Sequence, residues 1–343
     1  MKTIFAVDDS DSNLSLTKKA LEEHYRILTM PSAIKMFALL EKITPDLILL
    51  DIEMSEMNGV DAFRQLKTNK IYGQIPVIFL TGRNDTAIEA KCFEMGAVDF
   101  ITKPFSTPVL LNRIKTYLNI DEIIHERTEQ LQRLQSGIVS VLADIVENRD
   151  IETGGHVERI VAYIRILLEA MKERGVYADE IKGWDMETVI LSARLHDMGK
   201  IVVSDVVLNK PDKLTGDEYG VIRTHADEGV RIIEKMVEQT GEADFLQNAK
   251  LFAGYHHEFW DGSGYPYRLK GTDIPLQGRI MAIVDAYDAL ISKRPYKEAL
   301  AVEEAERIIM ENVGKQFDPD IARVFFEVKD QFKEAATSQE NAG

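Results

Sequence analysis

Residues 46–59 have the sequence DLILLDIEMSEMNG, in which four consecutive apolar residues, 47–50, are followed by the charged Asp51. An apolar run of this length without polar alternation is typical of a strand buried on both faces of a parallel sheet. Other short apolar runs lie at 3–7, 26–29, 77–80 and 98–101, and the segments between them, such as 13–24 and 87–95, have the apolar spacing of helices. Residues 1–118 are therefore predicted to form an α/β domain with a doubly wound, five-stranded parallel sheet.

Polar side chains stand where these predicted strands end. Asp8 and Asp9 follow the first strand, Asp51 the third, Thr81 the fourth and Lys103 the fifth. The carboxyl ends of the strands meet at one edge of such a sheet, so three carboxylates are expected to crowd into one pocket. A hard cation relieves that repulsion, and oxygen ligands suit Mg²⁺. The hydroxyl and the ammonium group could then hold a phosphoryl group on the carboxylate of Asp51.

Residues 119–147 have the pattern of one long helix. Apolar side chains recur at alternating steps of four and three, with one interruption at Arg127. The positions are Ile120, Ile124, Arg127, Leu131, Leu134, Ile138, Val141 and Ile145. This heptad seam predicts a linker helix that pairs with the same helix of a second copy. A helix packed on its own domain is the alternative.

Residues 148–333 are predicted to form a helical domain, interrupted by a Gly- and Pro-rich loop at 261–275. The tail at 334–343 is small and polar from Ala335 onward, so we expect it to be disordered.

The helical domain contains five of the seven histidines of the chain, together with carboxylates. The candidate ligands are Glu152, His156, His196, Asp197, His225, His256, His257 and Asp285. Mixed imidazole and carboxylate ligands without a thiolate suit Fe, Mn or Zn. On a helix, His196 could bind one metal while Asp197 reaches a second, and Lys200 would lie on the face of His196, four residues away. Gly199 would allow another element to approach closely.

The composition of the whole chain excludes several classes of protein. A net charge of −16 disfavours binding to nucleic acid, and no apolar run is long enough to span a membrane. The N-terminus lacks a signal peptide, and the single cysteine, Cys92, cannot form an internal disulfide. We therefore expect a cytoplasmic protein in which Cys92 belongs to the core.

The motifs AVDDS, DLILLDIEMSEMNG, FLTGRND and DFITKPF resemble the receiver domain of bacterial response regulators. The resemblance implies a cognate histidine kinase as a partner and Asp51 as the phosphoacceptor. It also implies that Mg²⁺ is held by Asp9, by Asp8 through water, by Asp51 and by the backbone carbonyl of Glu53. Thr81 and Lys103 would contact the phosphoryl oxygens, and Phe100 would be the aromatic switch. Ser55 and Gly82 depart from the family pattern and affect only the expected loop geometry.

The motifs NRDIETGGH, HDMGK, HHEFWDGSGYP and DAYDALISKRPYK resemble the HD-GYP family of cyclic di-GMP phosphodiesterases. The resemblance implies that the eight residues named above are metal ligands for two or three divalent metals, Fe or Mn. It assigns contacts with the substrate phosphate to Lys200, Arg294 and Lys297. The loop Gly264, Tyr265 and Pro266 would take part in substrate binding, and a diguanylate cyclase or an adaptor protein could dock on it.

The combined hypothesis is a response regulator that hydrolyses cyclic di-GMP to pGpG or GMP with metal assistance, in which Asp197 and Lys200 are catalytic. Phosphorylation of Asp51 would control the activity through the linker helix. Three alternatives stay open: a cyclic-dinucleotide receptor or adaptor without catalysis, a phosphodiesterase for cyclic GMP-AMP, and another phosphohydrolase of the HD superfamily. A receiver-containing transcription factor is disfavoured because the rear half has no basic recognition helix.

Overall fold

The computed structural model describes residues 1–69, 71–82, 86–149, 155–292 and 299–340. The chain divides into two compact units, residues 1–131 and 132–343. None of the described helices is both long enough and apolar enough to cross a membrane.

Unit 1 contains a five-stranded parallel sheet, as predicted. Its strands are β1 (Thr3–Val7), β2 (Arg26–Met30), β3 (Leu47–Asp51), β4 (Val77–Thr81) and β5 (Asp99–Thr102). They lie in the order β2-β1-β3-β4-β5, the crossover order of a doubly wound sheet. Three of the predicted strands extend one residue further than expected, and β5 is shifted by one. Asp51 and Thr81 are therefore the last residues of their strands.

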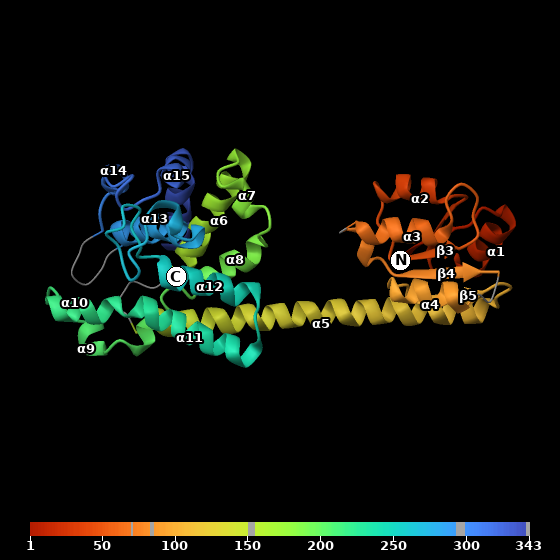
Figure 1. Cartoon of the computed structure of the whole chain (residues 1–343), viewed down its shortest axis with the longest axis horizontal. Helices are drawn as coiled ribbons and strands as arrows, with labels where there is room; N and C mark the ends of the chain where they lie inside the picture. Colours follow the sequence, from red (N-terminus) through yellow and green to blue (C-terminus); the bar gives the residue numbers. More distant parts are fainter. Residues whose placement is uncertain (70, 83–85, 150–154, 293–298, 341–343) are drawn as a thin grey trace. The chain divides into compact units, whose positions relative to one another are not determined.

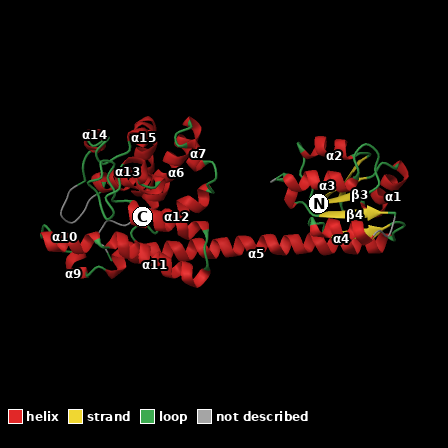
Figure 2. Ribbon diagram, viewed as in Figure 1, coloured by secondary structure: helices red, strands yellow, loops and turns green. Residues whose placement is uncertain are grey.

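Helices cover both faces of this sheet (Figures 1 and 2). The helices of unit 1 are α1 (Asp11–Leu21), α2 (Ala33–Leu40), α3 (Gly59–Thr68), α4 (Thr86–Glu94) and the first part of α5 (Thr107–Glu147). Successive strand residues point to opposite faces. Thus Ile48 and Leu50 pack in one cluster with residues of α2, α3 and α4, while Leu47 and Leu49 pack in a second cluster with residues of α1 and α5. Cys92 is fully buried in the first cluster, as expected.

Helix α5 passes through the predicted boundary at residue 118 without a break, so the boundaries at 118 and 148 stay predictions. All residues from 119 to 135 are exposed. Nearer its end, α5 packs on unit 2 through Val139, Ala143 and Val146. Ile138 and Val141 belong to the predicted seam and remain about half exposed.

Unit 2 is helical, as predicted. Its α-helices are α6 (His156–Arg174), α7 (Ala178–Ile181), α8 (Met186–Ala193), α9 (Asp205–Leu208), α10 (Gly216–Arg223), α11 (His225–Thr240), α12 (Asp244–Tyr255), α13 (Leu276–Ile291), α14 (Val302–Glu311) and α15 (Pro319–Glu340). Two 3₁₀ helices, η2 (Met198–Val202) and η3 (Gly271–Asp273), lie between them. The main core joins α6, α8, α13 and α15, and a second cluster joins α5, α11 and α12.

The prediction of a disordered tail from Ala335 is wrong for the residues that α15 covers, because α15 continues to Glu340. Ala335 and Ala336 pack against the main core, which extends the helix beyond the point where the polar composition suggested an end. Residues 341–343 lie outside the described residues.

Candidate metal centre

Five of the predicted ligands of unit 2 come from the ends of three helices and the interior of a fourth. His156 is the first residue of α6 and His225 the first residue of α11, while His256 and His257 directly follow α12. Asp285 lies within α13. Side chains at the ends of different helices can surround one point, whereas side chains on one helix face all approach from the same side.

His196 and Asp197 were expected on a helix, and this prediction is wrong. Helix α8 ends at Ala193, and the pair lies in a turn before η2. Lys200, within η2, still reaches the pair, with its Nζ 2.9 Å from Asp197 Oδ2. Gly199 permits the approach of η2 to α11 that the sequence suggested, since a Cβ on Gly199 would lie 1.8 Å from the carbonyl oxygen of His225.

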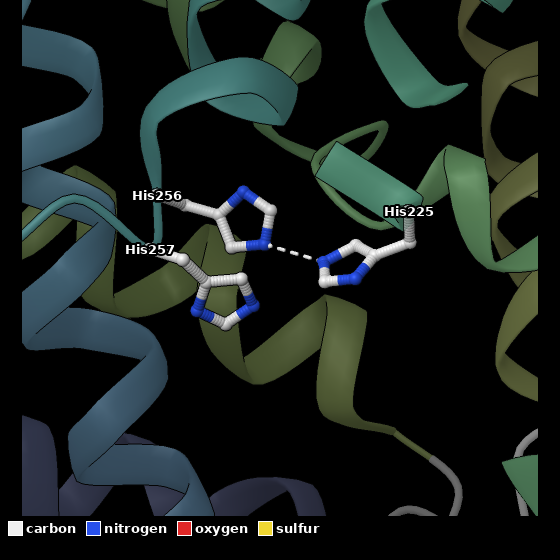
Figure 3. A group of neighbouring side chains, drawn as sticks. All are labelled: His225, His256 and His257. Atoms are coloured by element: carbon white, nitrogen blue, oxygen red, sulfur yellow. Dashed lines mark hydrogen bonds between the residues drawn. The ribbon is translucent and has the colours of Figure 1, made fainter. Parts of the chain in front are cut away.

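Six of the ligands form two groups of three, in each of which the candidate ligand atoms all lie within 4.8 Å of one another. The first group is His156, His196 and Asp285, and the second is His225, His256 and His257. In the first group His156 Nε2 lies 3.5 Å from His196 Nε2. In the second, His225 Nε2 lies 3.1 Å from His256 Nε2, and Figure 3 shows the rings of these two residues turned toward each other.

Asp197 lies between the two groups. Its Oδ2 is 3.4 Å from His196 Nε2 in the first group. Its Oδ1 is 3.5 Å from His225 Nε2 and 3.7 Å from His256 Nε2 in the second. One carboxylate thus faces both groups with different oxygens, which is the arrangement needed to share it between two cations.

The other ring nitrogen, Nδ1, of each of four histidines is held by the protein. His196 faces the carbonyl of Ala193 at 3.0 Å, His225 that of Ile222 at 2.7 Å, and His256 those of Phe252 and Ala253 at 3.0 Å. His156 Nδ1 lies 2.7 Å from Asp288 Oδ2. Such contacts favour the tautomer that donates from Nδ1 and leaves Nε2 as a metal ligand.

Sequence reasoning missed Asp288 and its second partner, Arg159. Arg159 Nε donates to Asp288 Oδ1 at 2.6 Å, and both side chains are buried. Burial alone would raise the pKa of Asp288, but the hydrogen bonds from His156 and Arg159 outweigh it and lower the pKa to about 2. The one available signal was the position of Asp288, three residues after Asp285 on α13.

The electrostatics of the cluster suit a cation. Burial, followed by the neighbouring His225, lowers the pKa of His256 to about 3, and burial also lowers the pKa values of His225 and His257. Neutral imidazoles are the form that binds metal. Burial would raise the pKa of Asp197, but Lys200, His196 and His225 outweigh it and hold the pKa well below its usual range. Neutral histidines and an ionised carboxylate therefore fit divalent metals at neutral pH.

The loop Gly264, Tyr265 and Pro266 lies against the second group. Gly264 packs so closely that a Cβ there would lie 2.5 Å from the carbonyl oxygen of His257. The ring of Tyr265 stacks on that of His257, with centroids 4.7 Å apart. The buried carboxylate of Glu258 accepts hydrogen bonds from the backbone N–H groups of Tyr267, Arg268 and Leu269, and so fixes the chain that follows the loop.

Three predicted site residues lie outside the described residues: Glu152, Arg294 and Lys297. The roles of Glu152 as a metal ligand and of Arg294 and Lys297 as phosphate contacts therefore stay predictions.

The predicted receiver site is also assembled. Ligand oxygens of Asp8, Asp9 and Asp51 lie within 4.8 Å of one another. Lys103 Nζ lies 2.7 Å from Asp51 Oδ1 and 2.6 Å from Asp8 Oδ2. Burial raises the pKa of Asp51 to about 6, although Lys103 opposes the rise. Three carboxylates at this spacing fit a hard divalent cation.

The remaining predicted receiver residues lie at the end of β4, just after β3, and on β5. Thr81 is buried at the end of β4, and Glu53 follows β3 by two residues. Phe100, on β5, is partly buried and stacks on Phe79 with ring centroids 5.1 Å apart.

Comparisons with known proteins agree with both halves of the chain. A family model described as HD domain matches residues 140–321, and one described as response regulator receiver domain matches residues 4–115. A probable cyclic di-GMP phosphodiesterase of Vibrio cholerae is 40% identical, over 97% of this chain and 79% of the relative. The cyclic di-GMP phosphodiesterase response regulator RpfG of Xanthomonas campestris is 32% identical, over 92% of this chain and 85% of the relative. A 3'3'-cGAMP-specific phosphodiesterase 2 of Vibrio cholerae is 36% identical, over 63% of this chain and 38% of the relative.

Proposed function

We propose that this chain, which belongs to the family of HD domain phosphodiesterases that carry a response regulator receiver domain, hydrolyses cyclic di-GMP at the histidine cluster of unit 2. The observation that carries the proposal is the position of Asp197, whose two oxygens lie 3.4 Å and 3.5 Å from histidines of two separate groups. This is how a protein would hold two cations on either side of one carboxylate.

The first group, His156, His196 and Asp285, would hold one divalent metal, and the second group, His225, His256 and His257, would hold another. Bound divalent metals of this kind polarise phosphoryl oxygens and lower the pKa of water. Imidazole and carboxylate donors suit Fe, Mn or Zn, and of these we propose Fe and Mn.

The side chains of the protein would bind and orient the diester. Lys200, whose ammonium group lies 2.9 Å from Asp197, would offset the negative charge that develops on the phosphoryl oxygens. Tyr265 and Pro266 would form the wall of the site, because Tyr265 covers His257. Arg294 and Lys297 would supply further positive charge.

Cyclic di-GMP is the substrate that two of the relatives' names support. The product would be linear pGpG, or GMP after a second cleavage. Cyclic GMP-AMP is the second candidate, because another relative is named for it. A receptor or adaptor that binds without cleaving is the third, and a diguanylate cyclase or other protein could dock on the Gly264–Tyr265–Pro266 loop in either case.

Regulation would begin at Asp51. A cognate histidine kinase would phosphorylate this carboxylate next to Mg²⁺ held by Asp8, Asp9 and the carbonyl of Glu53. Thr81, Lys103 and Phe100 would respond to the phosphoryl group, and α5 would carry the change to unit 2. An Asp51→Asn protein should lose every response to a phosphodonor; an undiminished response would remove this link.

The direct test is to incubate the purified full chain with cyclic di-GMP, under anaerobic Fe²⁺ and separately Mn²⁺, and to identify the nucleotides formed. Parallel incubations would contain cyclic GMP-AMP. The wild type should release pGpG or GMP, and the double variant His196→Ala, Asp197→Ala should release neither. His24→Ala, an exposed histidine of unit 1, is the matched control and should retain wild-type turnover. Full activity in the double variant would refute the metal mechanism.

A further inference from the structure

Arg223 lies next to the loop that covers the histidine cluster, between two tyrosine rings. Its guanidinium carbon is 4.7 Å from the ring centroid of Tyr265 and 4.5 Å from that of Tyr219. The guanidinium is thus held by aromatic faces, as in a cation–π contact. Tyr265 in turn stacks on His257, one of the second group of ligands, so this arginine borders the mouth of the proposed active site.

The local sequence fixes this position. Helix α10 begins with a capping box, in which Thr215 and Glu218 bond reciprocally, and Lys210 pairs with Glu218 at 2.7 Å. Tyr219 and Arg223 are four residues apart on this helix, so they share a face. Arg223 is the last residue of α10, two positions before His225. The anchor at the start of the helix therefore sets where the guanidinium lies relative to the cluster.

In the part of unit 2 that the structure describes, four other arginines have a carboxylate partner that Arg223 lacks. Arg159, Arg165, Arg194 and Arg279 each pair with a carboxylate. Within the described residues, no carboxylate pairs with Arg223, although the chain carries 57 acidic residues. The exposed guanidinium therefore keeps its hydrogen-bond donors for something outside the protein.

The ring of Tyr265 links this arginine to the cluster. One neighbour of the ring is His257, with ring centroids 4.7 Å apart, and another is the guanidinium of Arg223, 4.7 Å from the ring centroid.

We propose that Arg223 recognises the O6 and N7 edge of a guanine base of the bound cyclic dinucleotide. This inference rests on the proposed function and adds a determinant of its specificity. The planar guanidinium donates two parallel hydrogen bonds to guanine O6 and N7. Adenine offers an acceptor at N7 but a donor at N6, so the same pair of donors rejects it.

A guanine contact suits these surroundings better than a phosphate contact. The phosphate under attack would lie over the two groups of ligands, next to Lys200. The guanidinium of Arg223 lies beyond Tyr265, which itself covers His257. Arg223 is therefore placed to contact a part of the nucleotide other than the phosphate under attack.

The test compares Arg223→Ala and Arg223→Lys with the wild-type full chain on cyclic di-GMP and cyclic di-AMP. Turnover is measured with Mn²⁺, and binding is measured by calorimetry after chelation of metal, so that the second readout does not depend on catalysis. Arg231→Ala is the control, since Arg231 is an exposed arginine of α11 that pairs with Glu228. Thermal unfolding midpoints confirm that each variant folds.

We expect Arg223→Ala to lower kcat/KM and affinity for cyclic di-GMP by about 5- to 150-fold, the range of one bidentate arginine–guanine contact. Both values for cyclic di-AMP should change less than threefold. Arg223→Lys should resemble Arg223→Ala, because lysine keeps the charge but lacks the fork. Arg231→Ala should leave kcat/KM and affinity unchanged for both nucleotides.

Three outcomes would overturn the inference. The first is unchanged selectivity in Arg223→Ala. The second is an equal loss for both nucleotides that Arg223→Lys restores, which would indicate a phosphate contact. The third is failure of the wild type to prefer cyclic di-GMP in binding. A wild type that binds cyclic di-GMP selectively but never cleaves it would refute the proposed hydrolase while leaving the role of Arg223 intact.

Discussion

The Nδ1 atom of His156 lies 2.7 Å from Asp288, and Arg159 donates to the other oxygen of the same carboxylate at 2.6 Å. Neither contact involves His156 Nε2, the candidate ligand atom. They fix the ring of His156 so that its Nε2 points toward His196. The candidate metal centre thus depends on a carboxylate that would not itself touch a metal.

Replacing Asp288 by alanine should weaken both the fold and the metal centre. The buried guanidinium of Arg159 would lose the carboxylate that neutralises it, which costs about 3–5 kcal/mol of unfolding free energy. Loss of the contact with His156 should reduce metal affinity about 10- to 100-fold. Urea unfolding and metal titration of the full chain measure the two effects. Asp320→Ala, an exposed carboxylate of α15 paired with Arg323, should change stability by less than about 0.5 kcal/mol.

The carboxyl of Asp51 gives a pH-dependent prediction. Its pKa in the folded chain, about 6, is above the ordinary value near 3.8, because burial disfavours the charged form. The contribution of Asp51 to stability, isolated as the difference between wild type and Asp51→Asn, should therefore fall as the pH rises from about 4 to 6 and then level off. Asp51→Asn lacks this loss, so in EDTA it should be more stable than the wild type by about 1–2 kcal/mol at pH 7, allowing for solvent screening. A difference in urea midpoint that stays constant from pH 4 to 8 would contradict the prediction.

That candidate metal-binding side chains lie together could be predicted from the sequence, because five of the seven histidines fall within one helical domain with several carboxylates. His156, His196 and Asp285 lie up to 129 positions apart in sequence, yet they form one group. Asp288 could not be assigned, since a carboxylate on α13 looks the same in sequence whether it faces a metal or an arginine. The tyrosine contacts of Arg223 were equally hidden, because Tyr265 reaches it only through the fold.

Among the helices and strands, the five strands were predicted correctly, whereas the turn after α8 and the end of α15 were not. Short, mostly apolar segments separated by helical spacing placed all five strands, because strands buried on both faces lack polar alternation. The turn that holds His196 and Asp197 was predicted as helix. It lies between α8 and the 3₁₀ helix η2, and the apolar spacing of the sequence does not distinguish this tighter winding from an α-helix. The end of α15 was missed because packing of Ala335 and Ala336 on the core outweighs a polar composition.

The end of α5 contacts two elements of the candidate site. Glu147, its last residue, accepts a hydrogen bond from the backbone N–H of His156 at 2.7 Å. Arg149, just beyond, donates to the carbonyl of Ile201 in η2, to the carbonyl of Val203 at 3.1 Å and to Asp205 at 2.6 Å. A displacement of the end of α5 would therefore move the segments that carry His156 and Lys200.

Arg149→Ala should uncouple α5 from η2. Lys200 would be held less firmly, so kcat/KM should fall about tenfold while the metal content is retained. The response to a phosphodonor should shrink as well, if α5 acts through this contact. Arg174→Ala, which removes an exposed ion pair with Glu327, is the control. Wild-type kinetics together with a full phosphodonor response in Arg149→Ala would exclude this route.

For the molecule as a whole, the exposed side of α5 predicts association of two copies. Leu131, Leu134 and Ile138 are 65%, 58% and 51% exposed, while Val139 and Ala143 on another face of the helix are buried in unit 2. The folding of unit 2 therefore leaves the predicted seam free to pair. Ile123, which lies outside the predicted seam, is also 56% exposed and widens the apolar surface.

Leu134→Asp should convert a dimer of the full chain into a monomer, since a charge would be buried at the centre of the seam. Gln132→Asp adds the same charge two residues away, off the seam, and should leave the dimer intact. Sedimentation velocity over a range of concentrations distinguishes the two. A wild type that sediments as a monomer at every concentration would contradict pairing through residues 119–147.

The number of transition-metal ions that each full chain retains after loading with Mn²⁺ or Fe²⁺ and gel filtration tests the central claim most directly. Two groups of ligands that share Asp197 predict at least two ions in the wild type. They also predict a loss of one in His225→Ala and a loss of at least one in Asp197→Ala. Retention of fewer than two ions by the wild type, or the same number in all three proteins, would contradict the account.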